Sequence, residues 1–192
     1  PRGPPWTPRE RPGRAVAAAG AGDGRPTSHP VFGVGVDGRR AGRAVTDVSL
    51  LAAEPARISA FAVGTAGGRL GRVRADGLVV ATPLGSPGYA RAAGGPVLGP
   101  GAGAVVAPVA PFATAPDVWV LSVPPALSLS VERDEGPVEL LLDGEPRRRV
   151  GPDDRVTVRR AADLSVLWLP TVAGVAPAGG PDGKGSNESS SQ

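Results

Sequence analysis

Short apolar runs separated by turn dipeptides are the feature of this sequence that most restricts its fold. Leu127, Leu129 and Val131 alternate with polar residues, which is the pattern of a strand with one buried face. Asp-Gly pairs at 37–38 and 143–144 end similar runs, and this dipeptide is typical of tight β-hairpins. The pattern therefore favours an all-β, sandwich-like domain of short, mostly antiparallel strands.

The expected strands differ in how their apolar residues are spaced. Alternating strands should bury one face, whereas the continuous runs at 118–123, 138–142 and 164–169 should be covered on both faces. Two of these runs carry Trp119 and Trp168, which we expect in the core. The expected strands are 31–36, 44–51, 57–63, 78–81, 118–123, 127–131, 138–142, 156–158 and 164–169.

The composition fits one domain of this kind. A chain of 192 residues buries one ordinary core, and its 29 glycines and 23 prolines suit many turns. The net charge is only +3, so the sequence pI of about 10.4 reflects arginine in place of lysine. We interpret the arginines at 147–149 as solvated strand residues and expect no nucleic-acid partner.

Cysteine is absent and His29 is the single histidine. Disulfides, thiolate zinc sites and thiol nucleophiles are therefore excluded, and a Ser-His-Asp triad would have to use His29. We expect His29 to be structural and expect no metal site. No apolar run is long enough to span a membrane and the start lacks a signal peptide, so we expect a soluble, cytoplasmic protein without a membrane partner.

Gly33, Gly35 and Gly38 spell the G-x-G-x-x-G pattern of dinucleotide-binding turns. That turn needs a helix straight after its glycines, whereas residues 39–43 contain another glycine and no apolar face. A hairpin at 37–38 accounts for the same glycines, and we prefer it.

Changes in composition divide the chain into three regions. Residues 1–28 are rich in proline and arginine without apolar periodicity, so we expect a disordered or extended segment, or an extension from a misassigned start. Residues 29–171 form the expected β domain. Residues 172–192 are a low-complexity tail that we expect to be disordered.

Residues 74–96 have the pattern of a strand, a sharp corner and a short helix. An apolar run at 78–81 leads into a Gly-Ser-Pro corner, where Ser86 is a good helix N-cap and Pro87 suits the first helical position. The Gly-Gly-Pro sequence at 94–96 would end the helix. Such a corner directs unpaired backbone N–H groups outward, which is a ligand-binding geometry.

The same stretch carries a family motif. From Asp76 the chain reads D-G-L-V-V-A-T-P-x-G-S-x-x-Y-x-x-x-A-G-G-P, and A-P-V-A-P-F follows at 107–112. This order resembles the C-terminal, substrate-binding β domain of NAD kinases, by pattern over residues 29–170 and densely at 76–112. That family transfers the γ-phosphoryl group of ATP or polyphosphate to the 2'-hydroxyl of the adenosine ribose of NAD. The resemblance implies NAD or NADP as substrate or ligand, and a homo-oligomer in which a neighbouring subunit completes each site.

The resemblance also implies which residues contact the dinucleotide. Thr46 and Asp47 stand where the family has Asn-Glu, on the adenine and ribose side; Thr keeps a hydroxyl but loses the paired donor and acceptor of an amide. Arg74 and Asp76 would lie near the nicotinamide riboside, although Asp76 could instead begin an Asp-Gly turn. The implied contact residues are Thr46, Asp47, Arg57, Arg74, Asp76, Gly85, Ser86, Gly88, Tyr89, Ala92 and Ala110.

Other positions of the corner depart from the family. The Thr-Ala that follows Gly-Ser in the family is Pro87-Gly88 here, which removes a hydroxyl and a backbone N–H. A serine that the family often has three residues after the tyrosine is Ala92. Tyr89, the only tyrosine, could pack on the nucleoside or close the core.

The family's catalytic loop, G-G-D-G, belongs to an N-terminal lobe, and the nearest sequence here is G-A-G-D-G at 20–24. Asp23 would be the base, but Arg25 and Pro26 follow where the family begins a helix. No P-loop is present, and the only lysine is Lys184. ATP and a divalent metal are therefore implied only together with that lobe, and we expect this chain alone to be inactive.

Two functions remain open at this point. The chain is either the NAD-binding half of an NAD kinase whose catalytic lobe lies outside this sequence, or a non-catalytic NAD(H)- or NADP(H)-binding remnant of such an enzyme. The changes at Thr46, Asp47, Pro87 and Ala92 favour the remnant. Dinucleotide binding is favoured in either case by the retained residues Arg74, Asp76, Gly85, Ser86 and Tyr89.

Overall fold

The computed structural model describes residues 22, 25–54, 58–122, 126–133 and 136–168. Thr27–Val166 form one compact unit, which carries the candidate site. Most of the tails predicted at 1–28 and 172–192 lies outside the described residues, as do Asp23 and Arg57. Residues 25–28 are described and begin β1.

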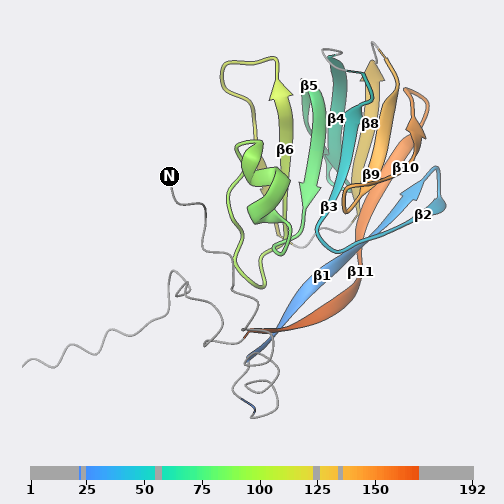
Figure 1. Ribbon diagram of the computed structural model, residues 1–192. Coiled ribbons are helices and arrows are strands. Elements are labelled where there is room, and N and C mark those ends of the chain that lie inside the picture. Colours follow the sequence, from blue (N-terminus) through green and yellow to red (C-terminus); the bar gives the residue numbers. More distant parts are fainter. Residues whose placement is uncertain (1–21, 23–24, 55–57, 123–125, 134–135, 169–192) are drawn as a thin grey trace, which may run out of the picture. The chain divides into compact units, whose positions relative to one another are not determined.

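The described chain is almost entirely β-structure, as the sequence predicts, and Figure 1 shows one helical segment beside the strands. The expected runs at 156–158 and 164–169 belong to a single long strand. The elements are β1 (Arg25–Val36), β2 (Arg39–Ala44), β3 (Asp47–Ala52), β4 (Ser59–Thr65), β5 (Gly68–Ala81), η1 (Ser86–Ala90), β6 (Ala104–Pro111), β7 (Trp119–Leu121), β8 (Leu127–Arg133), β9 (Val138–Leu142), β10 (Glu145–Val150) and β11 (Arg155–Trp168).

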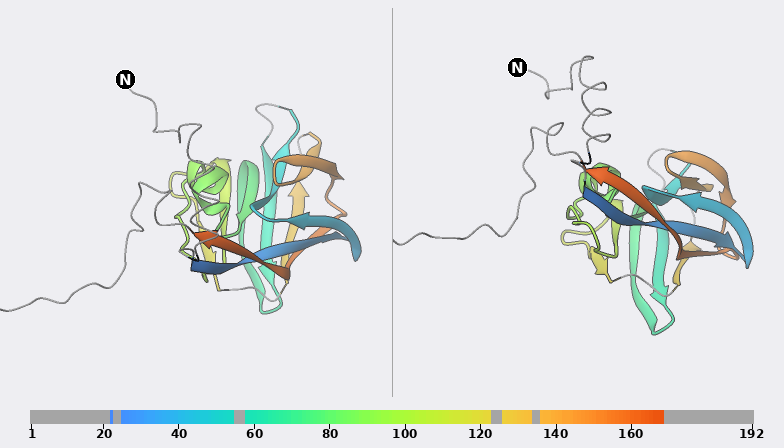
Figure 2. Two further views of the ribbon diagram at one scale, coloured as in Figure 1. Left: turned by 60° about the horizontal axis from the view of Figure 1, so that its bottom comes forward. Right: turned by 90° about the horizontal axis from the view of Figure 1, so that it is seen from below.

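The strands form one sheet that curls toward closure. Its order is β10-β9-β3-β5-β4-β8-β11-β1-β2, with β6 paired to β5 and β7 paired to β6. The two ends of this order approach each other, because a Cβ built on Gly42 of β2 would lie 2.6 Å from Leu142 Cδ1 of β9. Figure 2 shows the resulting barrel-like wall of strands. The all-β prediction is confirmed, and the two walls of the expected sandwich belong to a single sheet.

Strand β5 pairs with three other strands. This strand pairs antiparallel with β4 over residues 68–75, and with β3 over residues 77–81. It also pairs with β6 from Ala75 to Ala81. The change of neighbours from β4 to β3 falls at Asp76, which places this residue at an irregular point of an otherwise continuous strand.

Both faces of the second half of β5 are buried. Leu78 and Val80 point into the main core, which also contains Phe61, while Val79 and Ala81 pack in a second cluster with Ala90 of η1 and residues of β6. Successive residues of a strand point to opposite faces, so a continuous apolar run is what this position requires. The corner and η1 are thereby fixed on the outer face of β5 and β6.

Other continuous apolar runs are covered on one face only. Val138, Leu140 and Leu142 are buried and alternate with half-buried neighbours, and Leu164 and Leu167 are 38% and 45% exposed. The prediction of two covered faces is therefore wrong for these strands, because among the described residues no second layer packs outside them. Trp119 is half-buried and packs against the main core, as expected.

The Asp-Gly pairs form the predicted hairpin turns. Asp37 and Gly38 have φ of 51° and 76°, and Asp143 and Gly144 have φ of 52° and 81°, as a two-residue turn requires. The hairpin of β1 and β2 thus accounts for the glycines at 33, 35 and 38, and no dinucleotide-binding helix follows them. A Cβ on Gly33 would lie 2.7 Å from Ala161 Cβ, so this glycine permits the close approach of β1 and β11.

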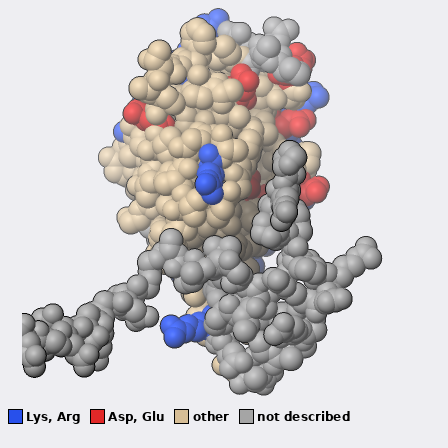
Figure 3. All heavy atoms as spheres, turned by 60° about the vertical axis from the view of Figure 1, so that its left-hand side comes forward, with Lys and Arg blue, Asp and Glu red and all other residues tan. Residues whose placement is uncertain are grey.

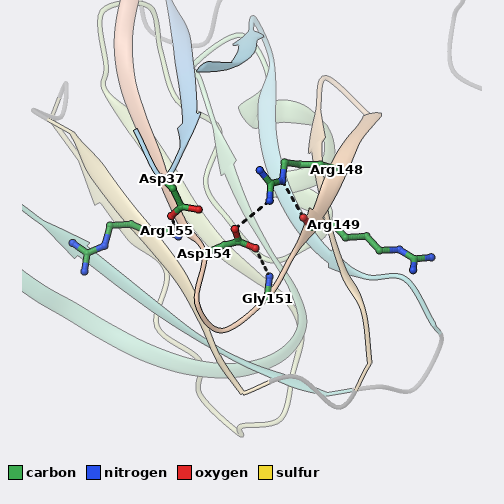
Figure 4. A network of polar contacts seen from close by, with 6 residues as sticks. All are labelled: Asp37, Arg148, Arg149, Gly151, Asp154 and Arg155. Carbon is green, nitrogen blue, oxygen red and sulfur yellow. Dashed lines mark hydrogen bonds and ion pairs between the residues drawn. The ribbon is translucent and has the colours of Figure 1, made fainter. Parts of the chain in front are cut away.

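The first turn is held by a network of polar contacts (Figure 4). The Asp37 carboxylate accepts a hydrogen bond of 2.9 Å from the Arg155 N–H, and this bond lowers its pKa. Nearby, Asp154 Oδ1 lies 3.2 Å from Arg148 Nη2, and its Oδ2 accepts from the Gly151 N–H at 2.9 Å. The network joins the β1–β2 turn to the corner between β10 and β11.

His29 lies on β1 and is 2% exposed, with Nε2 3.0 Å from Thr27 Oγ1. This burial within a strand is the structural placement expected for it. No helix in the described part of the chain has the length and apolar content that a membrane span needs.

Replacing Phe61 by alanine should lower the free energy of unfolding by about 3–5 kcal/mol, because a fully buried aromatic ring leaves a cavity. Phe112→Ala makes the same chemical change at a side chain that is 68% exposed, and should cost less than about 1 kcal/mol. Urea unfolding of both variants measures the difference. Equal losses would contradict the central position of Phe61.

Candidate functional site

The corner after β5 leads into one wide helical turn, as the sequence predicts. Pro87 lies in the first turn of η1, and Gly88 breaks the regular helical geometry with ψ of −120°. Helical residues continue to Ala92, and a turn at 93–94 follows in which Gly94 has φ of 89°. The Gly95 N–H donates to the Ala90 carbonyl at 2.8 Å. The strand, corner and helix therefore occupy the places expected for them.

Ser86 has a different part from the one predicted. Gly85 is the N-cap, and no side chain caps the helix. Ser86 is fully buried; its Oγ donates to the Pro83 carbonyl at 3.0 Å and accepts from the Leu98 N–H at 2.8 Å. The prediction of Ser86 as N-cap is wrong, because its hydroxyl instead fastens the segment after the helix to the corner.

Several backbone N–H groups of the corner donate hydrogen bonds within the corner itself. The Gly85 N–H donates to Thr82 Oγ1 at 3.1 Å, the Ser86 N–H to the Thr82 carbonyl at 2.8 Å, and the Gly88 N–H to the Gly85 carbonyl at 2.9 Å. The prediction that the corner directs unpaired N–H groups at a ligand is therefore wrong for these three residues. Thr82, which the sequence analysis did not single out, satisfies two of them.

Thr46 lies directly against the corner. A Cβ on Gly85 would lie 2.1 Å from the Thr46 carbonyl oxygen, so only glycine fits at position 85. Thr82 donates its N–H to the same oxygen at 2.9 Å and its hydroxyl to the Val45 carbonyl at 2.7 Å. Thr46 and Gly85 are 39 residues apart in sequence. These contacts therefore join the start of β3 and the Gly-Ser corner into one unit.

Tyr89 interacts electrostatically with two other predicted contact residues, Asp47 and Asp76. Tyr89 is 38% exposed, and its pKa is raised by burial first and then by the negative charges of Asp47 and Asp76. Asp47 accepts a hydrogen bond from Ser49 Oγ at 3.0 Å, and its Oδ2 lies 3.3 Å from Thr46 Oγ1. The tyrosine thus does not close the core; its side chain is partly exposed, and the negative charges of Asp47 and Asp76 act on its hydroxyl.

Asp76 lies within β5 and begins no turn, so its alternative interpretation as a turn residue is wrong. Opposite it on β6, Ala110 has a φ of 46°, in the left-handed region that non-glycine residues rarely adopt. The flanking pairs are Ala75 with Pro111 and Gly77 with Val109. Strained residues of this kind often occur at ligand sites, so the irregularity marks Asp76 and Ala110 as candidates.

Arg74 lies two residues before Asp76 and contacts an aromatic ring. Its guanidinium is 5.4 Å from the centroid of Phe112, a cation–π arrangement, and the Phe112 N–H donates to the Arg74 carbonyl at 2.8 Å. A cavity of about 290 Å³ opens here, lined in part by Arg72, Asp117 and Trp119. Of the predicted contact residues, Arg74 therefore borders this hollow, whereas Asp76 is not among its lining residues.

The remaining predicted residues are open to solvent or not described. Gly88 and Ala92 are exposed on η1 and its continuation, and a Cβ on Gly88 would meet nothing within 4 Å. Arg57 and Asp23 lie outside the described residues. Where the chain is described, no three His, Cys, Asp or Glu side chains are placed to hold a metal ion.

The site lies on a side of the molecule with few charges. Figure 3 shows the side that carries η1 and β6, where most side chains are uncharged. Val97, Phe112 and Val120 are 52%, 68% and 55% exposed.

A family model described as the ATP-NAD kinase C-terminal domain matches residues 45–168. The NAD kinase of Methanosarcina acetivorans is 38% identical over 90 residues, which are 46% of this chain and 33% of that protein. The NAD kinase of Gemmatimonas aurantiaca is 38% identical over 100 residues, 50% of this chain and 34% of that protein. The chain thus spans about a third of the length of the curated relatives it matches.

Two solved structures have a similar fold. Yeast NADH kinase complexed with NADH superposes with a TM-score of 0.70 at 18% identity, over 82% of this chain and 48% of that one. An NAD kinase from Archaeoglobus fulgidus in complex with ATP gives 0.64 at 24% identity, over 83% and 60%. At these identities the likeness shows the shared fold.

Removing the charge of Asp76 should lower the pKa of Tyr89. The carboxylate disfavours the phenolate, so Asp76→Asn removes one cause of the rise while burial, the larger cause, remains. Tyr89 is the only tyrosine, so absorbance at alkaline pH follows it alone. The wild type should titrate above the ordinary value of about 10, and Asp76→Asn measurably closer to it. Asp163→Asn, on β11 and paired with Arg160, is the control; an Asp76→Asn curve that overlays the wild type would place the carboxylate elsewhere.

Replacing Ala110 by glycine should raise the free energy of unfolding by up to about 1 kcal/mol. Glycine relieves a left-handed strain of roughly 1–2 kcal/mol and loses roughly 0.5–1 kcal/mol through its greater freedom in the unfolded chain. Ala107→Gly, at a regular buried position of the same strand, should instead be destabilising. Urea unfolding compares the two; destabilisation by both would show that the backbone at 110 is unstrained.

Proposed function

Because this chain belongs to the ATP-NAD kinase family, of which it carries the C-terminal domain, we propose that it supplies the dinucleotide-binding half of an enzyme that phosphorylates the 2'-hydroxyl of the adenosine ribose of NAD to give NADP. The observation that carries the proposal is the packing of the Gly-Ser corner against Thr46, which places Asp47 and the corner's Tyr89 in one unit. The domain boundaries of the proposal are residues 29–171, with the tails outside it.

The names of the relatives support a dinucleotide ligand. The yeast protein with the same fold was solved with NADH and the Archaeoglobus protein with ATP. In the proposed complex Thr46 and Asp47 face the adenosine ribose, and Arg74 and Asp76 face the nicotinamide riboside. Tyr89 offers its exposed ring as a packing surface for the nucleoside.

The described residues do the binding part of the reaction. The 2'-hydroxyl must be held, lose its proton to a base and attack the γ-phosphoryl group of the donor. Carboxylates such as Asp47 can accept a hydrogen bond from a ribose hydroxyl and orient it. ATP and a divalent metal would be held by a second lobe with the family's G-G-D-G loop, and Asp23 remains only a candidate for its base.

A second function is a non-catalytic sensor or remnant that binds NAD(H) or NADP(H). The observation that favours it is the internal use of polar groups: the Thr46 hydroxyl donates to protein carboxylates, and the Ser86 hydroxyl is enclosed. A G-G-D-G lobe in the coding DNA upstream of Pro1 would favour the kinase, whereas an unrelated neighbour would favour the remnant.

The proposal includes a homo-oligomer and a cytoplasmic location. The sparsely charged side with η1 and β6, and its exposed Val97, Phe112 and Val120, would suit contact with a second copy of the chain. Such a contact would bring another subunit to the cavity beside Arg74.

NADP and NAD should stabilise the purified chain against heat. A ligand that binds only the folded state contributes about 2.7 kcal/mol at a hundredfold excess over its Kd, which differential scanning fluorimetry resolves as a higher Tm. Asp76→Asn and Tyr89→Ala should reduce the shift, while Asp163→Asn should retain it. If the Tm of the folded wild-type chain does not change with millimolar NAD or NADP, the proposal of dinucleotide binding is wrong.

A further inference from the structure

The Asp143 carboxylate is committed to the start of β3. Its Oδ1 accepts from the Thr46 N–H and the Thr46 hydroxyl, each at 2.7 Å, and from the Asp47 N–H at 3.2 Å. The Val45 N–H donates to both carboxylate oxygens, at 3.0 and 2.9 Å. Three successive backbone N–H groups therefore surround one side-chain anion, the arrangement by which backbone amides otherwise bind small anions.

The position of Asp143 follows from the hairpin. Leu142 of β9 pairs with Val48 of β3, so the β9–β10 turn lies beside the residues that precede β3. Asp143 has a φ of 52° in this turn, which aspartate and asparagine tolerate better than other side chains. Its own N–H donates to the Asp47 carbonyl at 2.9 Å. The turn and residues 45–47 are thus joined from both directions.

The hydrogen bonds also set the charge of Asp143. Burial alone would raise its pKa, but the bonds from the Val45 and Thr46 N–H groups, the Thr46 hydroxyl and the Asp47 N–H together lower it. The carboxylate is therefore ionised at neutral pH and can only accept hydrogen bonds.

Residues 45–47 are consequently held on two sides, because Thr82 bonds the carbonyls of Val45 and Thr46 while Asp143 bonds the N–H groups. The Thr46 hydroxyl proton points to Asp143 at 2.7 Å, with Asp47 Oδ2 at 3.3 Å. Only the lone pairs of that hydroxyl remain for a ligand. Beside the Asp47 carboxylate, this end of the site offers hydrogen-bond acceptors.

We propose that Asp143 is a positioning residue for dinucleotide binding: it fixes Thr46 and Asp47 as a pair of acceptors, which a ligand must meet with donors such as ribose hydroxyls. The inference rests on the proposed function for its ligand. It also explains how threonine serves where the family has an amide: the hydroxyl, once its proton is engaged by Asp143, presents a single polarity.

Asp37 provides a matched control within the same chain. It begins the other Asp-Gly turn, has nearly the same φ, and its carboxylate also accepts a backbone N–H, from Arg155. None of its partners in Figure 4 belongs to the candidate site. Asparagine fits the backbone at both positions, so Asp37→Asn and Asp143→Asn each remove one charge from a hairpin turn.

The first test measures the Kd for NADP by isothermal titration calorimetry on the full chain. Asp143→Asn should raise the Kd about tenfold, the effect of losing one charge-assisted hydrogen bond of roughly 1.4 kcal/mol. Asp37→Asn should leave the Kd within about twofold of the wild type even if its Tm falls equally. Equal Kd values for the wild type and Asp143→Asn would overturn the proposal, as would equal losses in both variants.

A double-mutant cycle with Thr46→Val tests whether Asp143 acts through Thr46. Valine keeps the shape but removes the hydroxyl that Asp143 holds. If Asp143 positions this hydroxyl, Asp143→Asn should raise the Kd less in the Thr46→Val background than in the wild type. Fully additive losses would contradict positioning through Thr46, whereas a general loss of stability has no reason to depend on that hydroxyl.

Amide hydrogen exchange separates this proposal from the proposed function. Asp143→Asn should speed exchange at the N–H groups of 45–47, and Asp37→Asn should leave them protected. If the wild type does not bind NADP but this pattern appears, the dinucleotide function fails while the positioning of 45–47 stands. Unchanged exchange in Asp143→Asn would overturn the positioning whatever the ligand.

Discussion

The double burial of β5 is the constraint on which the rest of the structure depends. Leu78 and Val80 complete the main core, and Val79 and Ala81 pack under η1, so this half of the strand must be apolar on both faces. Water is excluded from both sides, and the backbone polar groups find partners in β3 and β6. The Gly-Ser corner follows the end of this strand, so the packing of β5 fixes the position of the corner.

The candidate site is built from polar groups that mostly satisfy one another. Thr82 engages the backbone of the corner and of residues 45–46, and Asp143 engages the N–H groups of 45–47. What remains accessible includes the half-buried carboxylates of Asp47 and Asp76 and the partly exposed ring of Tyr89. Such a surface can hold and orient a hydroxyl-bearing ligand, but the phosphate-binding cations of a transferase must come from other residues.

The sequence predicted the fold class, the hairpin turns and the strand, corner and helix because each depends on local chemistry: alternating residues, Asp-Gly dipeptides, and proline and glycine at helix ends. It did not predict the hydrogen bond from the Leu98 N–H to Ser86 Oγ, or the one from the Thr46 hydroxyl to Asp143, because both join residues distant in sequence. The left-handed backbone at Ala110 was equally invisible, since an alanine there contradicts local preference.

Many of the exposed arginines lie on the two strands that end the sheet order. The strands at the two ends of the sheet order, β2 and β10, expose Arg39, Arg40 and Arg43 and the arginines at 147–149. A strand from another molecule that paired with either edge would have to desolvate several guanidinium groups at once. The exposed arginines of β2 and β10 therefore disfavour pairing of these two strands with another molecule.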